Sequence, residues 1–177
     1  VYESSQGGDG CVSVEGDPAL ARDTERTTAD ARALHQLIDA PNLMVKIPGT
    51  SEGLPSIRTL IGEGRSINVT LIFSVPRYVE VMEAYISGLE EAVANGIEDL
   101  SHIASVASFF ISRTDTEVDR RLQEIGTDQA LGLQGKTAVA QAQVAYQQFL
   151  SSFSGARWEA LAAKGAQPQR PLWASTS

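Results

Sequence analysis

The stretch "NLMVKIPGT", residues 42–50, has the pattern of a short buried strand with one lysine inside it. Its apolar residues fall on both sides of the extended chain, which is typical of a strand in a parallel sheet. Leaving the Lys46 ammonium in a dry interior would cost several kcal/mol. The lysine is therefore exposed at a strand end, paired with an acid, or used for its neutral amine.

Four further segments are also short, mostly apolar and followed by turn or helix-capping residues. The predicted strands are Cys11–Glu15, Leu43–Ile47, Ile67–Phe73, Ala107–Ser112 and Leu172–Thr176. Helical segments separate them. This alternation favours an α/β fold with a parallel sheet, in a single domain of residues 1–177.

The predicted helices have recognisable ends. Asp17 and Pro18 predict a helix start, residues 19–38 continue it, and Pro41 stops it. The other predicted helices cover residues 54–61, 74–96, 116–125, 137–153 and 158–164.

The composition excludes several classes of partner. The net charge of −8 repels nucleic acid, and the longest apolar stretches are too short to span a membrane. Cys11 is the single cysteine, and no Cys or His cluster has metal-ligand spacing. We therefore expect a cytoplasmic protein with no metal, no cofactor, no nucleic-acid partner and no membrane contact.

Polar side chains lie near the carboxyl ends of the predicted strands, where parallel α/β folds collect their functional groups. They are Glu15, Lys46, Asn68, Thr70, Ser108, Arg113 and Ser175. Strand alternation predicts that Asn68, Thr70 and Ile72 share one face. An amine, a carboxylate, an amide, hydroxyls and a guanidinium together suit a polyhydroxylated anionic substrate.

Each of these residues also has an ordinary structural interpretation. Lys46 can extend its stem along the strand and its head into water. Glu15 can stabilise a helix start, and Arg113 can pair with Asp115 or Glu117 in solvent. Buried amides and hydroxyls often only satisfy backbone groups. Only the combination favours a functional site.

Five motifs in order carry a family resemblance: "VSVEGDP", "NLMVKIPGTSEGLPSI", "INVTLIFS", "VASFFISRTDTEVD" and "QRPLWAST". They resemble transaldolase, in the actinobacterial-type bacterial branch of the class I aldolase superfamily. The resemblance covers essentially all 177 residues. It implies a (β/α)8 TIM barrel, of which this chain is a central fragment with about five consecutive units, the third to the seventh strand.

The resemblance implies a transferase of the pentose phosphate pathway. Lys46 would form a Schiff base with a ketose phosphate, fructose 6-phosphate or sedoheptulose 7-phosphate, and pass a dihydroxyacetone unit to an aldose phosphate. An amine between apolar walls is partly neutral and attacks a ketone. Glu15 would hold and polarise the catalytic water, and Thr70 would orient it.

The same resemblance implies the substrate contacts. Asn68 would bind substrate hydroxyls, Ser108 would contact the substrate, and Arg113 and Ser175 would belong to the phosphate pocket. The planar guanidinium of Arg113 can donate two parallel hydrogen bonds to one phosphate group.

Two alternatives stay open. One is a class I aldolase of the fructose-6-phosphate type, which releases its product to water. The other is a catalytically silent, truncated fragment, because no residue here corresponds to the family's general acid/base aspartate on the first strand. Five strands of a barrel would leave two sheet edges exposed, so we also expect self-association.

Overall fold

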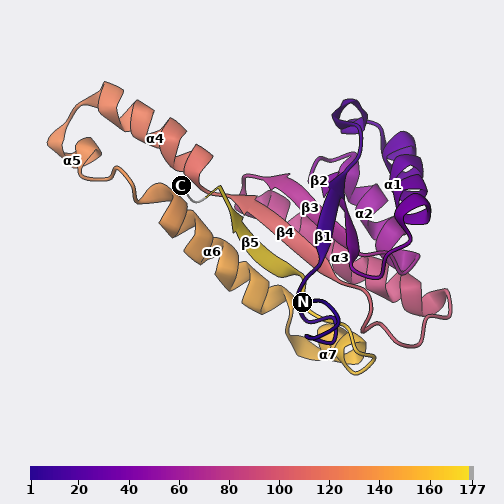
Figure 1. Cartoon of the computed structure of the whole chain (residues 1–177). Helices are drawn as coiled ribbons and strands as arrows, with labels where there is room; N and C mark the ends of the chain where they lie inside the picture. The colour runs from indigo at the N-terminus through magenta and orange to yellow at the C-terminus, as the bar shows by residue number, and fades with distance from the viewer. Residues whose placement is uncertain (176–177) are drawn as a thin grey trace.

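The computed structural model describes residues 1–175 and contains one parallel sheet with flanking helices (Figure 1). Its strands are β1 (Val12–Glu15), β2 (Leu43–Pro48), β3 (Ile67–Ile72), β4 (Ser105–Phe110) and β5 (Arg170–Ala174). They pair in chain order, each parallel to the next. A sheet in chain order winds in one direction, as a barrel does, whereas a doubly wound sheet reverses its order. The predicted α/β fold is confirmed.

The helices cover one side of the sheet and extend beyond it. They are η1 (Pro18–Leu20), α1 (Thr24–Ile38), α2 (Gly53–Gly62), α3 (Val75–Ala94), α4 (Ser112–Ile125), α5 (Asp128–Leu131), α6 (Thr137–Ser152) and α7 (Gly155–Ala162). In Figure 1, α4 and α5 project away from the sheet and α6 returns alongside β5. None of the helices within residues 1–175 has the length and low charge needed to cross a membrane.

Several predicted boundaries are wrong. The helix expected to begin at residue 116 begins at Ser112, the one expected at 158 begins at Gly155, and the fifth strand begins at Arg170 instead of Leu172. The fourth strand runs over residues 105–110, because the chain turns into α4 at Ser112. The predicted helix 19–38 is interrupted, because Asp17 caps only η1 while Asp23 caps α1. Of the predicted fifth strand, Thr176 lies outside the described residues.

The predicted alternation in β3 is also wrong at its end. Leu71 adopts a positive φ of 59°, and the pairing with β4 shifts between Val69 and Ile72. A bulge of this kind adds one residue and reverses which side the following residues face. Ile72 is therefore fully buried in the helix-side core, and does not share a face with Asn68 and Thr70.

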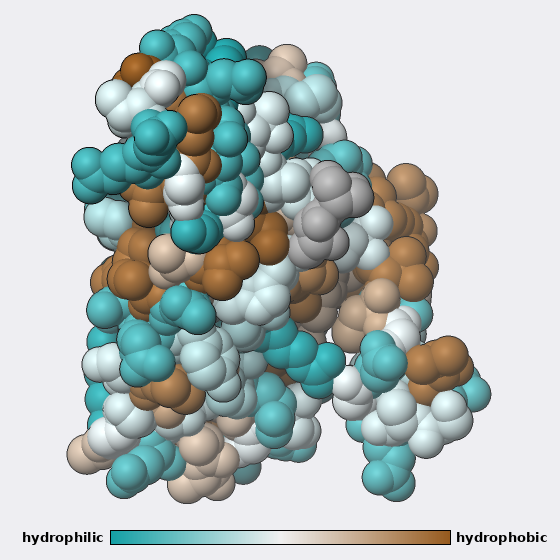
Figure 2. All heavy atoms as spheres, turned by 90° about the vertical axis from the view of Figure 1, so that its left-hand side faces the viewer, coloured by the Kyte–Doolittle hydropathy of each residue, from teal (hydrophilic) through white to brown (hydrophobic). Residues whose placement is uncertain are grey.

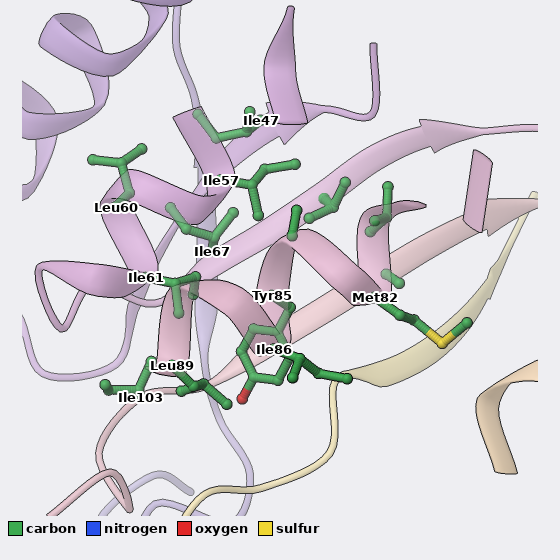
Figure 3. Packing of buried hydrophobic residues seen from close by; sticks show 14 of the residues in the cluster. Ile47, Ile57, Leu60, Ile61, Ile67, Met82, Tyr85, Ile86, Leu89 and Ile103 are labelled. Carbon is green, nitrogen blue, oxygen red and sulfur yellow. The ribbon is translucent and has the colours of Figure 1, made fainter. Parts of the chain in front are cut away.

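The main core lies between the sheet and helices α2 and α3 (Figure 3). Figure 3 labels buried residues from both helices and from the strands, among them Ile47, Ile57, Leu60, Ile61, Ile67, Met82, Tyr85 and Leu89. Gly88 allows the two helices to approach, because a Cβ there would lie 2.7 Å from the Cβ of Ile61. Helices α2 and α3 therefore pack closely together against the sheet.

The opposite face of the sheet lines a hollow of about 640 Å³. Ser13, Met44, Asn68 and Leu172 contribute to its wall, together with residues 5–9 of the N-terminal segment. Figure 2 views the molecule from the end that carries α4 and α5, and shows hydrophobic side chains exposed between hydrophilic ones.

Candidate active site

Neighbouring strands β1 and β2 bring a carboxylate and an amine together. Glu15 and Lys46 are register partners, and Lys46 Nζ lies 3.5 Å from Glu15 Oε1. The Lys46 side chain is 32% exposed and that of Glu15 is 69% exposed. The lysine is thus paired with an acid at the edge of the solvent, rather than enclosed in a dry interior.

Both side chains line a pocket of about 230 Å³, and Thr70 of β3 lines it too. The rest of the wall includes the β1–α1 connection and apolar residues of β2. Asp30 of α1 is a further carboxylate in this wall that the sequence did not single out. A side chain at position 16 would collide with the Asp30 carboxylate, so Gly16 leaves room for it.

The Asn68 carboxamide is hydrogen-bonded on both sides. Ser108 Oγ donates to Asn68 Oδ1 at 2.9 Å, and Asn68 Nδ2 donates to Ser13 Oγ at 2.9 Å. Asn68 and Ser108 are buried. Ser13 is not among the predicted site residues, although it lies two residues before Glu15 and strand periodicity places both on one face.

Ser175 lies against Ser112, the residue before Arg113, at the start of α4. The Ser112 backbone N–H donates to the Ser175 carbonyl, and the Ser112 hydroxyl donates to Ser175 Oγ, both at 2.9 Å. The Arg113 guanidinium lies over the Phe110 ring, 5.0 Å from its centroid. The N-cap residue of α4 is Ile111, whose side chain makes no capping hydrogen bond to the first N–H groups of the helix. The Thr114 and Asp115 N–H groups donate to the Ile111 carbonyl, so the Arg113 guanidinium is the group here that suits an anion.

The ion pairs considered for Arg113 are not formed. Among the residues that the structure describes, Arg113 makes no salt bridge. Asp115 instead accepts from the Ala138 backbone N–H of α6, and Glu117 pairs with Arg120 and Arg121. The guanidinium is therefore available to a ligand.

The predicted residues thus fall into three groups on neighbouring strands. Glu15, Lys46 and Thr70 share one pocket, Asn68 and Ser108 form one hydrogen-bonded pair, and the third group joins the ends of β4 and β5. In the described part of the chain, no group of three or more His, Cys, Asp or Glu side chains is arranged to hold a metal ion. The available chemistry is that of an amine, carboxylates, hydroxyls, an amide and a guanidinium.

Comparisons with known proteins agree on one family. The sequence profile described as Transaldolase/Fructose-6-phosphate aldolase matches residues 3–176. Proteins named transaldolase are similar over nearly the whole chain: 62% identical in Thermobifida fusca over 99% of this chain, and 58% in Acidothermus cellulolyticus and 56% in Frankia alni, both over 100%. The chain covers 48% of the first relative and 47% of the other two, so it spans about half the length of the curated relatives it matches.

Proposed function

Because the chain belongs to the Transaldolase/Fructose-6-phosphate aldolase family, we propose that the protein is a transaldolase with Lys46 as its nucleophile. The family fold is a (β/α)8 barrel, and five consecutive parallel units in chain order fit a section of such a barrel. The observation that carries the proposal is the 3.5 Å approach of Lys46 Nζ to Glu15 at adjacent strand ends.

The reaction begins when the neutral Lys46 amine attacks C2 of a ketose phosphate such as fructose 6-phosphate or sedoheptulose 7-phosphate. The proton that the amine gives up can pass to Glu15, which lies 3.5 Å away. Loss of water then leaves an iminium. The water stays within reach of Glu15 and Thr70, which line the same pocket.

Cleavage follows from the electron demand of the iminium. The C4 hydroxyl would give its proton to the family's general acid/base aspartate, to which no residue of this chain corresponds. The C3–C4 bond then breaks, its electron pair moves toward the iminium nitrogen, and an aldose phosphate leaves. A three-carbon enamine remains on Lys46 and attacks the aldehyde carbon of a second aldose phosphate. Hydrolysis of the new iminium releases the product ketose and restores the amine.

The other two groups serve binding. Asn68 keeps one N–H and one lone pair beyond its contacts with Ser13 and Ser108, and these suit substrate hydroxyls. Arg113 and Ser175 would hold the phosphate, where a local positive charge offsets the net charge of −8. The reaction belongs to the pentose phosphate pathway, and we propose a cytoplasmic location.

Reductive trapping tests this function. The natural protein is incubated with fructose 6-phosphate and borohydride, and its peptides are analysed by mass spectrometry. We expect a reduced three-carbon or sugar adduct on Lys46, and none in a Lys46→Met variant. Lys136 at the start of α6 serves as the matched control, since it donates to the Gly132 carbonyl on the surface and should stay unmodified.

The outcomes separate the alternatives. Product that forms only when an aldose phosphate is supplied indicates a transferase, whereas product without an acceptor indicates an aldolase. An unmodified Lys46 in protein shown to be folded would contradict both and favour a catalytically silent fragment.

A further inference from the structure

The hydrogen bond between Ser13 and Asn68 crosses an intervening strand. Ser13 belongs to β1 and Asn68 to β3, and β2 lies between them. In a flat sheet these strands are about 9.6 Å apart, twice the usual spacing. A direct contact of 2.9 Å therefore requires the sheet to curve, so that side chains on its hollow face converge.

The second hydrogen bond completes the restraint. Ser108 of β4 donates to Oδ1 of the same carboxamide, so three strands hold one planar group. The last torsion of an asparagine is otherwise broad. With a partner on each side, the carboxamide plane is fixed while one N–H and one lone pair remain free.

We propose that Ser13 is a positioning residue, which holds the Asn68 carboxamide in the plane from which Asn68 binds the substrate hydroxyls. The inference rests on the proposed function. Ser13 acts through Asn68 and needs no contact with the substrate itself. Its hydroxyl is half-buried on the same face of β1 as Glu15.

Kinetic measurements on the natural protein test the role in the reaction. Ser13→Ala should lower kcat/KM by about three- to tenfold, the size of one hydrogen bond. Ser13→Thr keeps the hydroxyl and should restore most of the loss. Because Ser13 acts through Asn68, Ser13→Ala should have no further effect in an Asn68→Ala background. Losses that multiply in the double variant would overturn the proposal.

A matched control uses another buried serine of the sheet. Ser105 donates to the Ile67 carbonyl and accepts from Gln169, and neither of these hydrogen bonds involves Asn68. Ser105→Ala should leave kcat/KM unchanged at temperatures where the variant is folded. Ser13→Cys, which preserves volume but is a weak acceptor, replaces Ser13→Ala if that variant does not fold.

A spectroscopic measurement separates this inference from the proposed function. The side-chain amide protons of Asn68 should shift and exchange faster with solvent in Ser13→Ala, and return toward the natural values in Ser13→Thr. Unchanged Asn68 signals would overturn the positioning role, even if Lys46 forms its adduct. If Lys46 forms no adduct while the Asn68 signals are altered, the proposed function is overturned. The contact between Ser13 and Asn68 is then structural only, so the positioning role in catalysis is overturned as well.

Discussion

At the scale of single residues, the site depends on which partners each charged group already has. Lys46 lies beside Glu15 and is about one-third exposed, so its amine is near both the carboxylate and solvent. Arg113 stacks on Phe110 and has no acid partner in the described part of the chain. The sequence around Arg113 would also fit a solvated ion pair with Asp115 or Glu117. The structure excludes this pair because both acids contact other residues.

Replacing Arg113 tests the phosphate pocket. Arg113→Ala should raise KM for a ketose phosphate by roughly 10- to 100-fold, because it removes charge-assisted hydrogen bonds to the phosphate. Arg113→Lys should recover only part of this loss, since an ammonium lacks the planar fork. Steady-state kinetics measures both variants.

Arg120 on the same helix is the control for that experiment. It forms salt bridges with Glu117 and Glu124, so Arg120→Ala should leave KM unchanged. Equal KM values for the natural protein and Arg113→Ala would exclude Arg113 from substrate binding.

At the scale of helices and strands, the platform under the site is fixed by packing and by ion pairs between helices. Arg157 of α7 binds Glu83 and Glu90 of α3, and also contacts Ser87. These hydrogen bonds hold the pKa of both Glu83 and Glu90 below the usual value. The α7 helix, which precedes β5, is thereby tied to the core helix α3.

The lowered pKa values give this contact a pH dependence. A carboxylate with a depressed folded-state pKa stabilises the fold above its unfolded-state pKa, about 4.5 here, and the contribution disappears as the pH falls through the folded-state value. Arg157→Gln should therefore lower the free energy of unfolding at pH 7 by about 1 kcal/mol, a modest value because the side chains are about half exposed. As the pH falls below 4.5 the natural protein and the variant should begin to converge, and their difference should disappear below the folded-state pKa values.

Urea unfolding at several pH values measures this effect. Arg121→Gln is the control. Within residues 1–175, Arg121 pairs only with Glu117 on its own helix, so its replacement should change stability less. A difference between natural protein and Arg157→Gln that persists unchanged below pH 4 would contradict the assignment to the two glutamates.

At the scale of the whole molecule, the sheet ends in two outer strands. Within residues 1–175, β1 and β5 each pair with a single neighbour. Outer strands offer unpaired N–H and C=O groups to another chain. The family resemblance seen in five sequence motifs is confirmed by the profile match, and a barrel family closes such edges by pairing them.

We therefore predict that the 177-residue chain self-associates through its sheet edges. Light scattering should give a mass above 18.9 kDa that rises with concentration. Val12→Lys places a charge on the outer strand β1 and should weaken the association.

Val139 of α6 supplies the control for this prediction. Val139 is 58% exposed and Val12 is 57% exposed, so Val139→Lys adds the same charge at equal exposure but away from β1. A mass of 18.9 kDa at every concentration would contradict self-association, and equal effects of the two lysines would exclude the sheet edge.

The sequence by itself determined the number and direction of the strands and the family. These properties follow from local periodicity and from short motifs, which a linear chain carries directly. The tertiary structure alone decided that a bulge at Leu71 turns Ile72 into the core, and that Ser13 reaches Asn68 across β2. It also decided that the Asp115 carboxylate accepts a hydrogen bond from the Ala138 N–H of α6. These outcomes depend on sheet curvature and on partners distant in the chain. A hydrogen bond between non-adjacent strands cannot be predicted from the spacing of residues along either strand.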